Sequence, residues 1–117
     1  MNIADVQGAQ LDYWVARAAE LISGREMWIK EDTGVEGYWL RGVLFSPSTN
    51  WAHGGPIIEQ ERIAIWPGTE AQPFSNIWTA GIADADGTFR ESDEHLGATP
   101  LIAAMRAYVA SKLGHEI

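Results

Sequence analysis

The stretch that decides the fold is Thr99–Gly114, TPLIAAMRAYVASKLG. Thr99 is a residue type that caps helix N-termini, and Pro100 suits the first helical position, where its missing N–H is not needed. Gly114 suits the position just after a helix, and Lys112 complements the negative end of the helix dipole. The sequence therefore predicts a helix between these two end signals.

Apolar side chains recur at helical spacing within this stretch. They form a stripe that consists of Leu101, Ile102, Met105, Tyr108, Val109 and Leu113. Arg106 and Lys112 fall outside the stripe. We therefore expect an amphipathic helix with one face in the core.

A second amphipathic helix is predicted from about Gln10 to Ser23, with Gly24 as its stop signal. Its apolar stripe consists of Leu11, Trp14, Val15, Ala18, Ala19 and Ile22. The side away from the stripe carries Asp12, Tyr13, Arg17 and Glu20, which are therefore expected to face solvent.

Segments between the two helices have the composition of strands. Glu26–Glu31 and Tyr38–Phe45 flank a turn-rich connector, Asp32–Gly37, and this pattern predicts a hairpin.

Two further strands are predicted at Arg62–Trp66 and Asn76–Ala83. The turn dipeptide Asp86-Gly87 then favours a short return strand at Thr88–Glu91. Helices that bracket several strands predict an α+β fold. We expect a single domain over residues 1–117, with a mainly antiparallel sheet of about four or five strands and the N-terminal and C-terminal helices packed on it.

The charge balance bears on the class of partner. Sixteen acidic residues stand against eight Lys and Arg among the 117 residues, which gives a net charge of −8. Proteins that bind phosphate backbones carry clusters of Lys and Arg. The closest basic pairs here are Arg25 with Lys30 and Arg106 with Lys112, so direct nucleic-acid binding is not expected.

Cysteine is absent, which excludes disulfides and thiolate metal sites. The apolar stretches fall far short of the roughly 20 residues that a membrane helix needs. Met1–Gln10 lacks the basic residues of a secretory signal. We therefore expect no membrane association and a cytoplasmic location.

The composition is unusual in its tryptophans, which are Trp14, Trp28, Trp39, Trp51, Trp66 and Trp78. A large apolar side chain contributes strongly to a small core, so five of the six are expected to pack there. The exception is Trp51, which lies in a polar stretch.

That stretch, Ser46–Pro56, is dense in Ser, Pro, Asn and Gly, and this composition predicts an irregular loop rather than a strand or a helix. Pro56 could open a single helical turn. Two interpretations stay open: Trp51 plugs the core and the loop is a brace, or the loop binds a ligand. The candidate ligand-binding residues are Trp51, His53, Gly54, Gly55 and Glu59, together with Asp12 and Tyr13 from the nearby start of the first helix.

The sequence contains no recognisable catalytic or metal-binding pattern. His53, His95 and His115 lack metal-ligand spacing, and His95 beside Asp93 and Glu94 is typical of a solvated acidic loop. Neither a phosphate-binding loop nor a G-x-S-x-G motif is present. We therefore assign no catalytic residues, no metal and no cofactor.

Three segments resemble the NinX-like family of phage and prophage proteins: Leu11–Ala18 (LDYWVARA), Phe45–Glu59 (FSPSTNWAHGGPIIE) and Thr99–Gly114. Together they cover 39 of the 117 residues, in the family's order. Pro67–Ala98 matches no family pattern. The resemblance implies a phage-associated protein of the bacterial host cytoplasm, without an assigned activity or catalytic residues to carry over.

These observations lead to one main hypothesis and two alternatives. The first is a small acidic, non-enzymatic accessory protein that binds a protein partner from the host or the phage. The second is an enzyme that handles a small molecule or a nucleotide, with its site at Trp51–Glu59. The third is a self-assembling structural protein, since a homo-oligomer is compatible with apolar helix faces.

Overall fold

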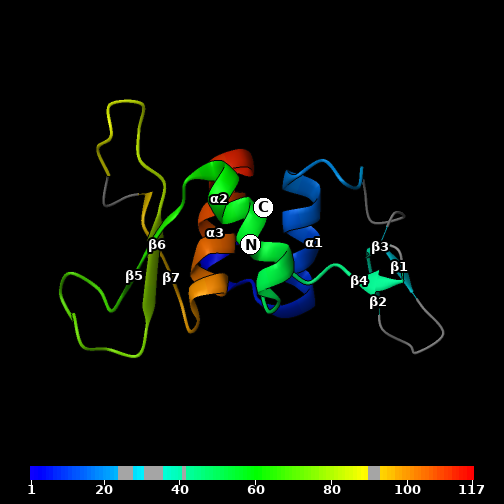
Figure 1. Ribbon diagram of the computed structural model, residues 1–117, viewed down its shortest axis with the longest axis horizontal. Coiled ribbons are helices and arrows are strands. Elements are labelled where there is room, and N and C mark those ends of the chain that lie inside the picture. Colours follow the sequence, from blue (N-terminus) through cyan, green and yellow to red (C-terminus); the bar gives the residue numbers. More distant parts are fainter. Residues whose placement is uncertain (24–27, 31–35, 41, 90–92) are drawn as a thin grey trace.

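The computed structural model describes residues 1–23, 28–30, 36–40, 42–89 and 93–117. It contains a short 3-10 helix, η1 (Ile3–Asp5), and three α-helices, α1 (Gly8–Ala18), α2 (Trp51–Glu61) and α3 (Pro100–Leu113). Strands lie at both ends of an elongated molecule that measures 45 × 28 × 26 Å, with the helices between them (Figure 1). The predicted α+β class is confirmed.

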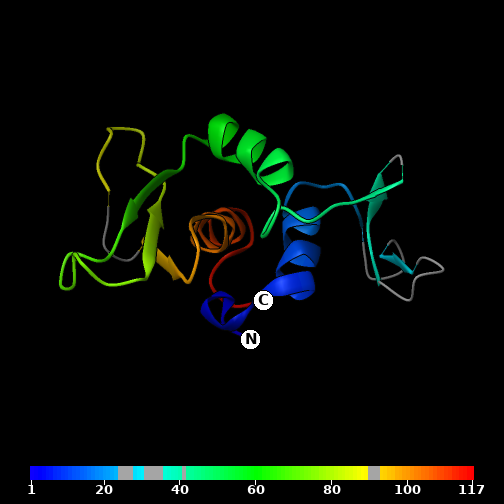
Figure 2. The same ribbon diagram turned by 60° about the horizontal axis from the view of Figure 1, so that its bottom comes forward.

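Helix α3 lies at the centre of the molecule. It contacts α1, α2, η1 and the strands β5 (Ala64–Pro67), β6 (Trp78–Gly81) and β7 (His95–Gly97), and Figure 2 shows it almost end-on among them. The predicted end signals are confirmed, because the Thr99 hydroxyl accepts a hydrogen bond from the amide of Ile102 at 3.2 Å and Gly114 ends the helix.

The expected amphipathic character of α3 is wrong. Its buried residues extend well beyond a single stripe and are Leu101, Ala103, Ala104, Met105, Ala107, Tyr108 and Val109. The remaining side, with Ile102, Arg106 and Ala110, is half-buried. Leu113, placed in the predicted stripe, is exposed instead. A helix that packs against several neighbouring elements needs apolar residues on most of its surface, and the alanines let those elements approach closely.

Helix α1 begins two residues before the predicted Gln10 and ends well before Ser23. It ends because Glu20 adopts a left-handed conformation with φ of 60°. The amide of Glu20 then bonds to the carbonyl of Arg17 at 3.1 Å, and that of Leu21 to the carbonyl of Ala16 at 2.9 Å. This pattern is a Schellman motif without its usual glycine, and the predicted stop, Gly24, lies outside the described residues.

The expected solvent face of α1 is partly wrong. Asp12 and Tyr13 are buried, because the turn before α2 covers Asp12 and Trp28 packs edge-on against Tyr13 at 5.6 Å. Arg17 is half-buried.

The largest correction concerns the predicted irregular loop, because its second half is helix α2. Asn50 caps the helix by accepting a hydrogen bond from the amide of Ala52 at 2.9 Å. Pro56 lies inside the helix and leaves the carbonyl of Ala52 without its usual donor. Ala52 is exposed, so water can bind this carbonyl. Two glycines and a proline therefore did not prevent a helix that begins at a strong cap.

The sheets are smaller than the expected four or five strands. Strand β6 pairs antiparallel with both β5 and β7, in the order β5-β6-β7. The predicted strands at Arg62–Trp66 and Asn76–Ala83 therefore correspond to β5 and β6. The third strand is β7 and not Thr88–Glu91, of which Thr88 and Phe89 lie outside any strand and residues 90–91 outside the described residues.

The remaining strands form two two-stranded ribbons at the other end of the molecule. Strand β1 (Ile29–Lys30) pairs antiparallel with β2 (Glu36–Gly37), so a hairpin forms in the predicted region. Its second strand is shorter than predicted, because Tyr38–Phe45 contains a hairpin of its own, β3 (Trp39–Leu40) with β4 (Val43–Leu44). Residues 24–27, 31–35 and 41 of this region lie outside the described residues.

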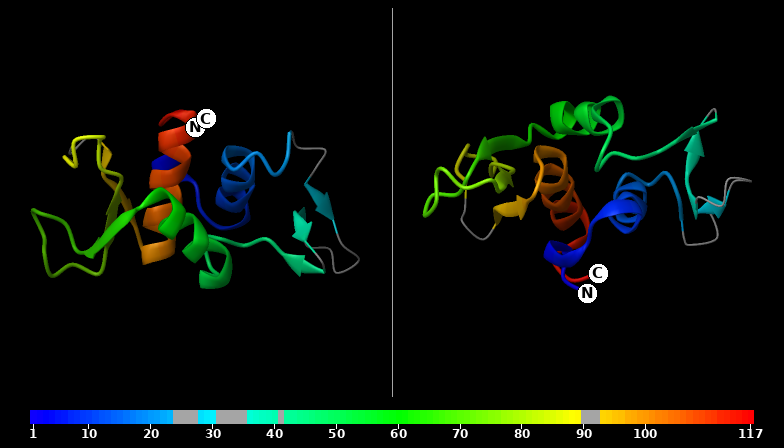
Figure 3. Two further views of the ribbon diagram at one scale, coloured as in Figure 1. Left: turned by 45° about the horizontal axis from the view of Figure 1, so that its top comes forward. Right: turned by 90° about the horizontal axis from the view of Figure 1, so that it is seen from below.

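The first and last residues lie side by side near the C-terminal end of α3 (Figure 3). The amide of Ile3 bonds to the carbonyl of His115 at 2.8 Å, and that of Ile117 to the carbonyl of Met1 at 2.9 Å. This pairing fixes the segment after α3 against η1 and thereby sets the position of His115. Within the described ranges, no helix is long and apolar enough to cross a bilayer.

Candidate functional site

Two of the sequence-predicted residues hold the turn that precedes α2. Oδ1 of Asp12 accepts a hydrogen bond from the buried amide of Ser48 at 2.8 Å. Burial raises the pKa of Asp12, while the hydrogen bonds from Ser48 and the proximity of His53 oppose that rise.

His53 holds the other end of the same turn. Its Nδ1 accepts a hydrogen bond from the amide of Ser46 at 2.9 Å, and its ring stacks on Phe45 with centroids 5.7 Å apart. Asp12 and His53 thus clamp residues 46–48 from two elements. These contacts favour the structural-brace interpretation for this part of the segment.

Trp51 lies apart from the clamp, at the first position of α2, and 55% of its surface is exposed. The interpretation that it plugs the core is therefore wrong. Its indole borders a recess of about 240 Å³ between the N-terminal ends of α2 and α3. We call this recess the Trp51 groove; it is lined by Ser48, Thr49, Trp51, Thr99, Pro100, Leu101 and Ile102.

The other sequence-predicted residues lie outside the groove lining. Gly54 is buried where α2 meets α3, and a Cβ there would lie 2.6 Å from Cδ2 of Leu101 and from the carbonyl oxygen of Pro47. Gly55 has open space around it, and Glu59 is exposed. Tyr13 packs edge-on against Trp14 at 5.1 Å. The structure therefore brings together Asp12 and His53, and places Trp51 in a separate surface.

The remaining tryptophans are less buried than expected. Trp28 is 5% exposed, and Trp14 and Trp78 pack partly buried against the core. Trp39 and Trp66 are half-buried. The expectation of five core tryptophans therefore holds fully for Trp28 alone among the six, all of which are described.

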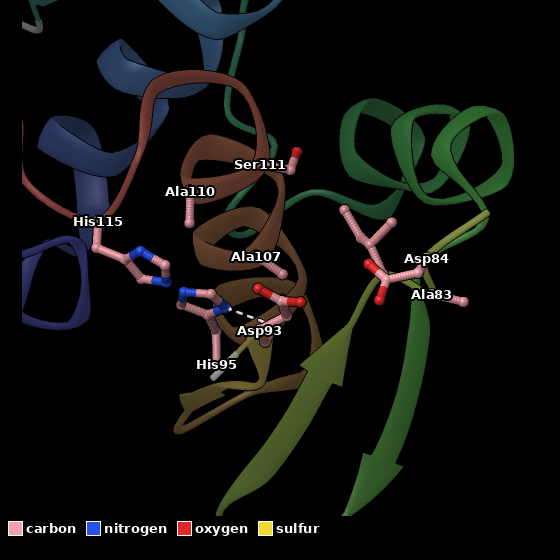
Figure 4. A pocket seen from close by; sticks show the side chains of 9 residues that line it. Ala83, Asp84, Asp93, His95, Ala107, Ala110, Ser111 and His115 are labelled. Carbon is pink, nitrogen blue, oxygen red and sulfur yellow. Dashed lines mark hydrogen bonds between the residues drawn. The ribbon is translucent and has the colours of Figure 1, made fainter. Parts of the chain in front are cut away.

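A second recess, of about 220 Å³, collects polar residues that sequence reasoning missed. We call it the His95 pocket; its lining is Ile82, Ala83, Asp84, Asp93, His95, Ala107, Ala110, Ser111 and His115. It lies where the end of β6, the start of β7 and the C-terminal half of α3 meet (Figure 4).

His95 is the most buried polar group of this pocket, at 7% exposure. Its Nδ1 lies 3.1 Å from the carbonyl oxygen of Asp93, and its ring stacks on His115 with centroids 5.1 Å apart and planes within 16°. Burial lowers the pKa of His95, and the neighbouring His115 and Arg106 lower it further, whereas Asp93 opposes them. His95 is therefore a neutral, structurally fixed imidazole at pH 7.

The prediction of a solvated acidic loop around His95 is wrong, and the reason for the error lies in the local sequence. His95 and Gly97 are buried while Leu96 between them is exposed, which is the alternation of a strand with one covered face. That pattern spans three residues, and the acidic residues before it masked the signal. The described part of the chain brings together no group of three or more His, Asp or Glu side chains that could hold a metal ion.

The chain was compared with known proteins and protein families. No curated protein matches it. The model of a family described as "Bacteriophage P22, NinX" matches residues 2–112. This match confirms the resemblance drawn from three segments and extends it through Pro67–Ala98. The chain therefore belongs to the NinX family of phage proteins.

Proposed function

We propose that this protein acts in the host cytoplasm as a phage accessory protein that binds a protein partner through the Trp51 groove. The single observation that carries the proposal is the exposure of Trp51 beside a recess. An indole left in water forgoes the apolar burial that it could contribute to a small core. Tryptophan is also the residue type most enriched among the side chains that dominate protein–protein binding energy.

The groove offers a rigid frame for such contacts. The caps at Asn50 and Thr99 fix the first turns of α2 and α3, and Pro100 restricts the backbone at the first position of α3. The close approach of α2 to α3 at Gly54 holds the two helix ends together. A preformed surface loses little conformational entropy on binding, which favours affinity.

The lining also indicates what the partner presents. Leu101, Ile102 and Trp51 supply apolar contact, while the hydroxyls of Thr49 and Thr99 lie at exposed residues of the rim. An apolar side chain of the partner would fill the recess against the indole. The net charge of −8 favours a partner surface that carries basic residues around that side chain, because opposite charges steer association.

The proposal is tested by photo-crosslinking in bacteria that express the phage proteins. A photoreactive phenylalanine analogue replaces Trp51 in one variant and Phe74 in the other. Phe74 is a matched control, because it is an aromatic residue, 98% exposed, in the β5–β6 connection. We expect an adduct of defined mass with a phage or host protein from position 51 and none from position 74.

A competition experiment distinguishes specific docking from chance proximity. Excess unmodified protein should suppress the adduct, whereas the Trp51→Ala variant should not. With the purified partner, Trp51→Ala should cost at least about 2 kcal/mol, or roughly thirtyfold in affinity. No adduct at position 51, equal adducts at both positions, or full competition by the Trp51→Ala variant would each overturn the proposal.

A further inference from the structure

The His95 pocket is separate from the Trp51 groove, with which it shares no lining residue. Its apolar wall comes from Ile82, Ala107 and Ala110, and its polar groups come from β7, from the turn after β6 and from the end of α3. Figure 4 shows the carboxyl group of Asp84 extending from the segment after β6 toward the side on which Asp93 and His95 lie. The question is what this set of groups would bind.

The strongest sign of a ligand is a nitrogen without a partner. Nε2 of His95 is buried and has no hydrogen-bond partner among the described residues. A buried polar atom left unsatisfied costs about 1–3 kcal/mol, so native structures seldom keep one without a reason. The carbonyl of Asp93 can only accept, so the hydrogen bond at Nδ1 requires the proton there. In the neutral ring, Nε2 is therefore a hydrogen-bond acceptor.

The other polar groups of the pocket also accept. The hydroxyl of Ser111 donates its hydrogen to the carbonyl of Tyr108 at 2.7 Å, which leaves its lone pairs for another donor. The carboxylates of Asp84 and Asp93 accept and carry negative charge. The pocket also lies along the last turns of α3, where the helix dipole favours a cation.

The nearby cation, Arg106, is engaged elsewhere. Its Nε donates to the carbonyl of Val6 at 3.0 Å and its Nη1 to that of Leu96 at 2.7 Å. Arg106 does not line the pocket. It helps to keep His95 neutral, and hence an acceptor.

We propose that the His95 pocket binds a small organic cation of the aliphatic amine class. One ammonium group would donate to Nε2 of His95, which lies on the side of the ring that faces His115 (Figure 4). The carboxylate of Asp93, on the other side of the ring, would supply negative charge, and the carbon chain would lie against Ala107 and Ala110. A volume of about 220 Å³ is below the range of drug-sized sites, roughly 300–1,000 Å³, which limits the ligand to a few carbon atoms. The absence of a three-ligand group in the described residues favours an amine over a metal ion.

The probe is 1,4-diaminobutane, with 1,4-butanediol as its uncharged counterpart. Binding is followed by titration calorimetry and by the ¹⁵N chemical shift of the His95 ring at pH 7. We expect saturable binding of the diamine, a shift at Nε2 as it gains a donor, and no binding of the diol. An unmoved Nε2 signal, absence of saturation, or equal binding of the diol would overturn the proposal.

A matched pair of variants separates the site from general charge attraction. Asp93→Asn removes the pocket carboxylate but keeps the backbone carbonyl that orients His95, whereas Glu94→Gln removes the same charge from a neighbour outside the lining. Loss of this negative charge should weaken diamine binding about tenfold in Asp93→Asn. Glu94→Gln should leave it within about twofold, as expected of a half-buried charge outside the pocket lining that solvent partly screens. Equal weakening by both variants would show nonspecific attraction and contradict the proposal.

A second variant tests the nitrogen itself. His95→Phe keeps an aromatic ring that can stack on His115 but has no acceptor, so the diamine should no longer bind. Circular dichroism checks that the variant is folded. A folded His95→Phe variant that binds the diamine as the unmodified protein does would also overturn the proposal.

Discussion

The backbone amide of Ser48 donates a 2.8 Å hydrogen bond to Oδ1 of Asp12, and both residues are buried. The bond joins α1 to the turn that precedes α2, across 36 residues of sequence. The carboxylate loses most of its hydration there, and burial raises its pKa despite the bonds from Ser48. Asp12 therefore fixes the position of the turn, although burial disfavours the charged form of its carboxyl group.

Two substitutions at Asp12 separate these effects. Asp12→Ala leaves the buried amide of Ser48 without an acceptor, so it should lower the free energy of unfolding by about 1–3 kcal/mol. Asp12→Asn keeps an oxygen acceptor and removes the charge, so it should retain most of the stability at pH 7. Urea denaturation measures both values. Equal losses in the two variants would show that the charge, and not the hydrogen bond, holds the turn.

The pH dependence of the Asn variant follows from the raised pKa of Asp12. A carboxyl group whose folded-state pKa lies above its ordinary 3.8 contributes most to stability below that value, and the contribution is lost as the pH rises through the raised pKa. The stability of Asp12→Asn relative to the unmodified protein should therefore increase with pH over this interval. Urea midpoints at several pH values from 3 to 7 test the sign; a relative stability that falls with pH would contradict it.

The two glycines of α2, Gly54 and Gly55, provide a matched pair of substitutions. Gly54→Ala would place a Cβ 2.6 Å from the carbonyl oxygen of Pro47, a backbone atom that cannot move without shifting the turn. We expect a loss of about 1–3 kcal/mol from this overpacking. Gly55→Ala meets open space and should stabilise the helix by about 0.5–1 kcal/mol. The midpoint of thermal denaturation should therefore fall in Gly54→Ala and rise in Gly55→Ala. A higher midpoint in Gly54→Ala would refute the close approach of α2 to α3.

Because His95 is buried as a neutral ring, we expect the protein to lose stability in mild acid. The pKa of His95 is lowered from the ordinary 6.5 by burial and by His115 and Arg106, against Asp93, so the folded state favours the neutral ring. Its contribution is present above pH 6.5 and is lost as the pH falls through the lowered folded-state pKa. The unmodified protein should therefore lose more unfolding free energy between pH 7.5 and 5 than His95→Phe does. Parallel losses, measured by urea denaturation, would count against a buried neutral His95.

The sequence predicted a helix end correctly where the chemistry of the residues at that end determines its position. Thr99, Pro100 and Gly114 bounded α3 correctly, because capping depends on the chemistry of those residues. The C-terminal end of α1 was missed, because Glu20 adopts a left-handed conformation that is usual for glycine, and Arg62 ends α2 in the same way. Such a conformation is imposed by the packing of the whole chain, and the identity of the residue does not reveal it.

The burial of side chains could be predicted less well, because it depends on the neighbours of each element. A single stripe was expected on α3, and the buried alanines Ala103, Ala104 and Ala107 lie outside that stripe, because three helices and a sheet pack against α3. The candidate site shows the same limit. Trp51 was singled out by its polar sequence context, whereas His95 joins Ser111 and His115 only after β7 packs beside α3.

The contrast between Trp51 and Trp28 provides the final prediction. Trp28 is 5% exposed and packs edge-on against Tyr13, so Trp28→Ala should remove a core contact and lower the unfolding free energy by about 3–5 kcal/mol. Trp51 is 55% exposed at the start of α2, so Trp51→Ala should change the stability by less than about 1 kcal/mol. Urea denaturation, followed by circular dichroism, compares the two. A loss at Trp51 as large as that at Trp28 would mean that the indole supports the fold, and it would remove the argument that this side chain is kept on the surface for a partner.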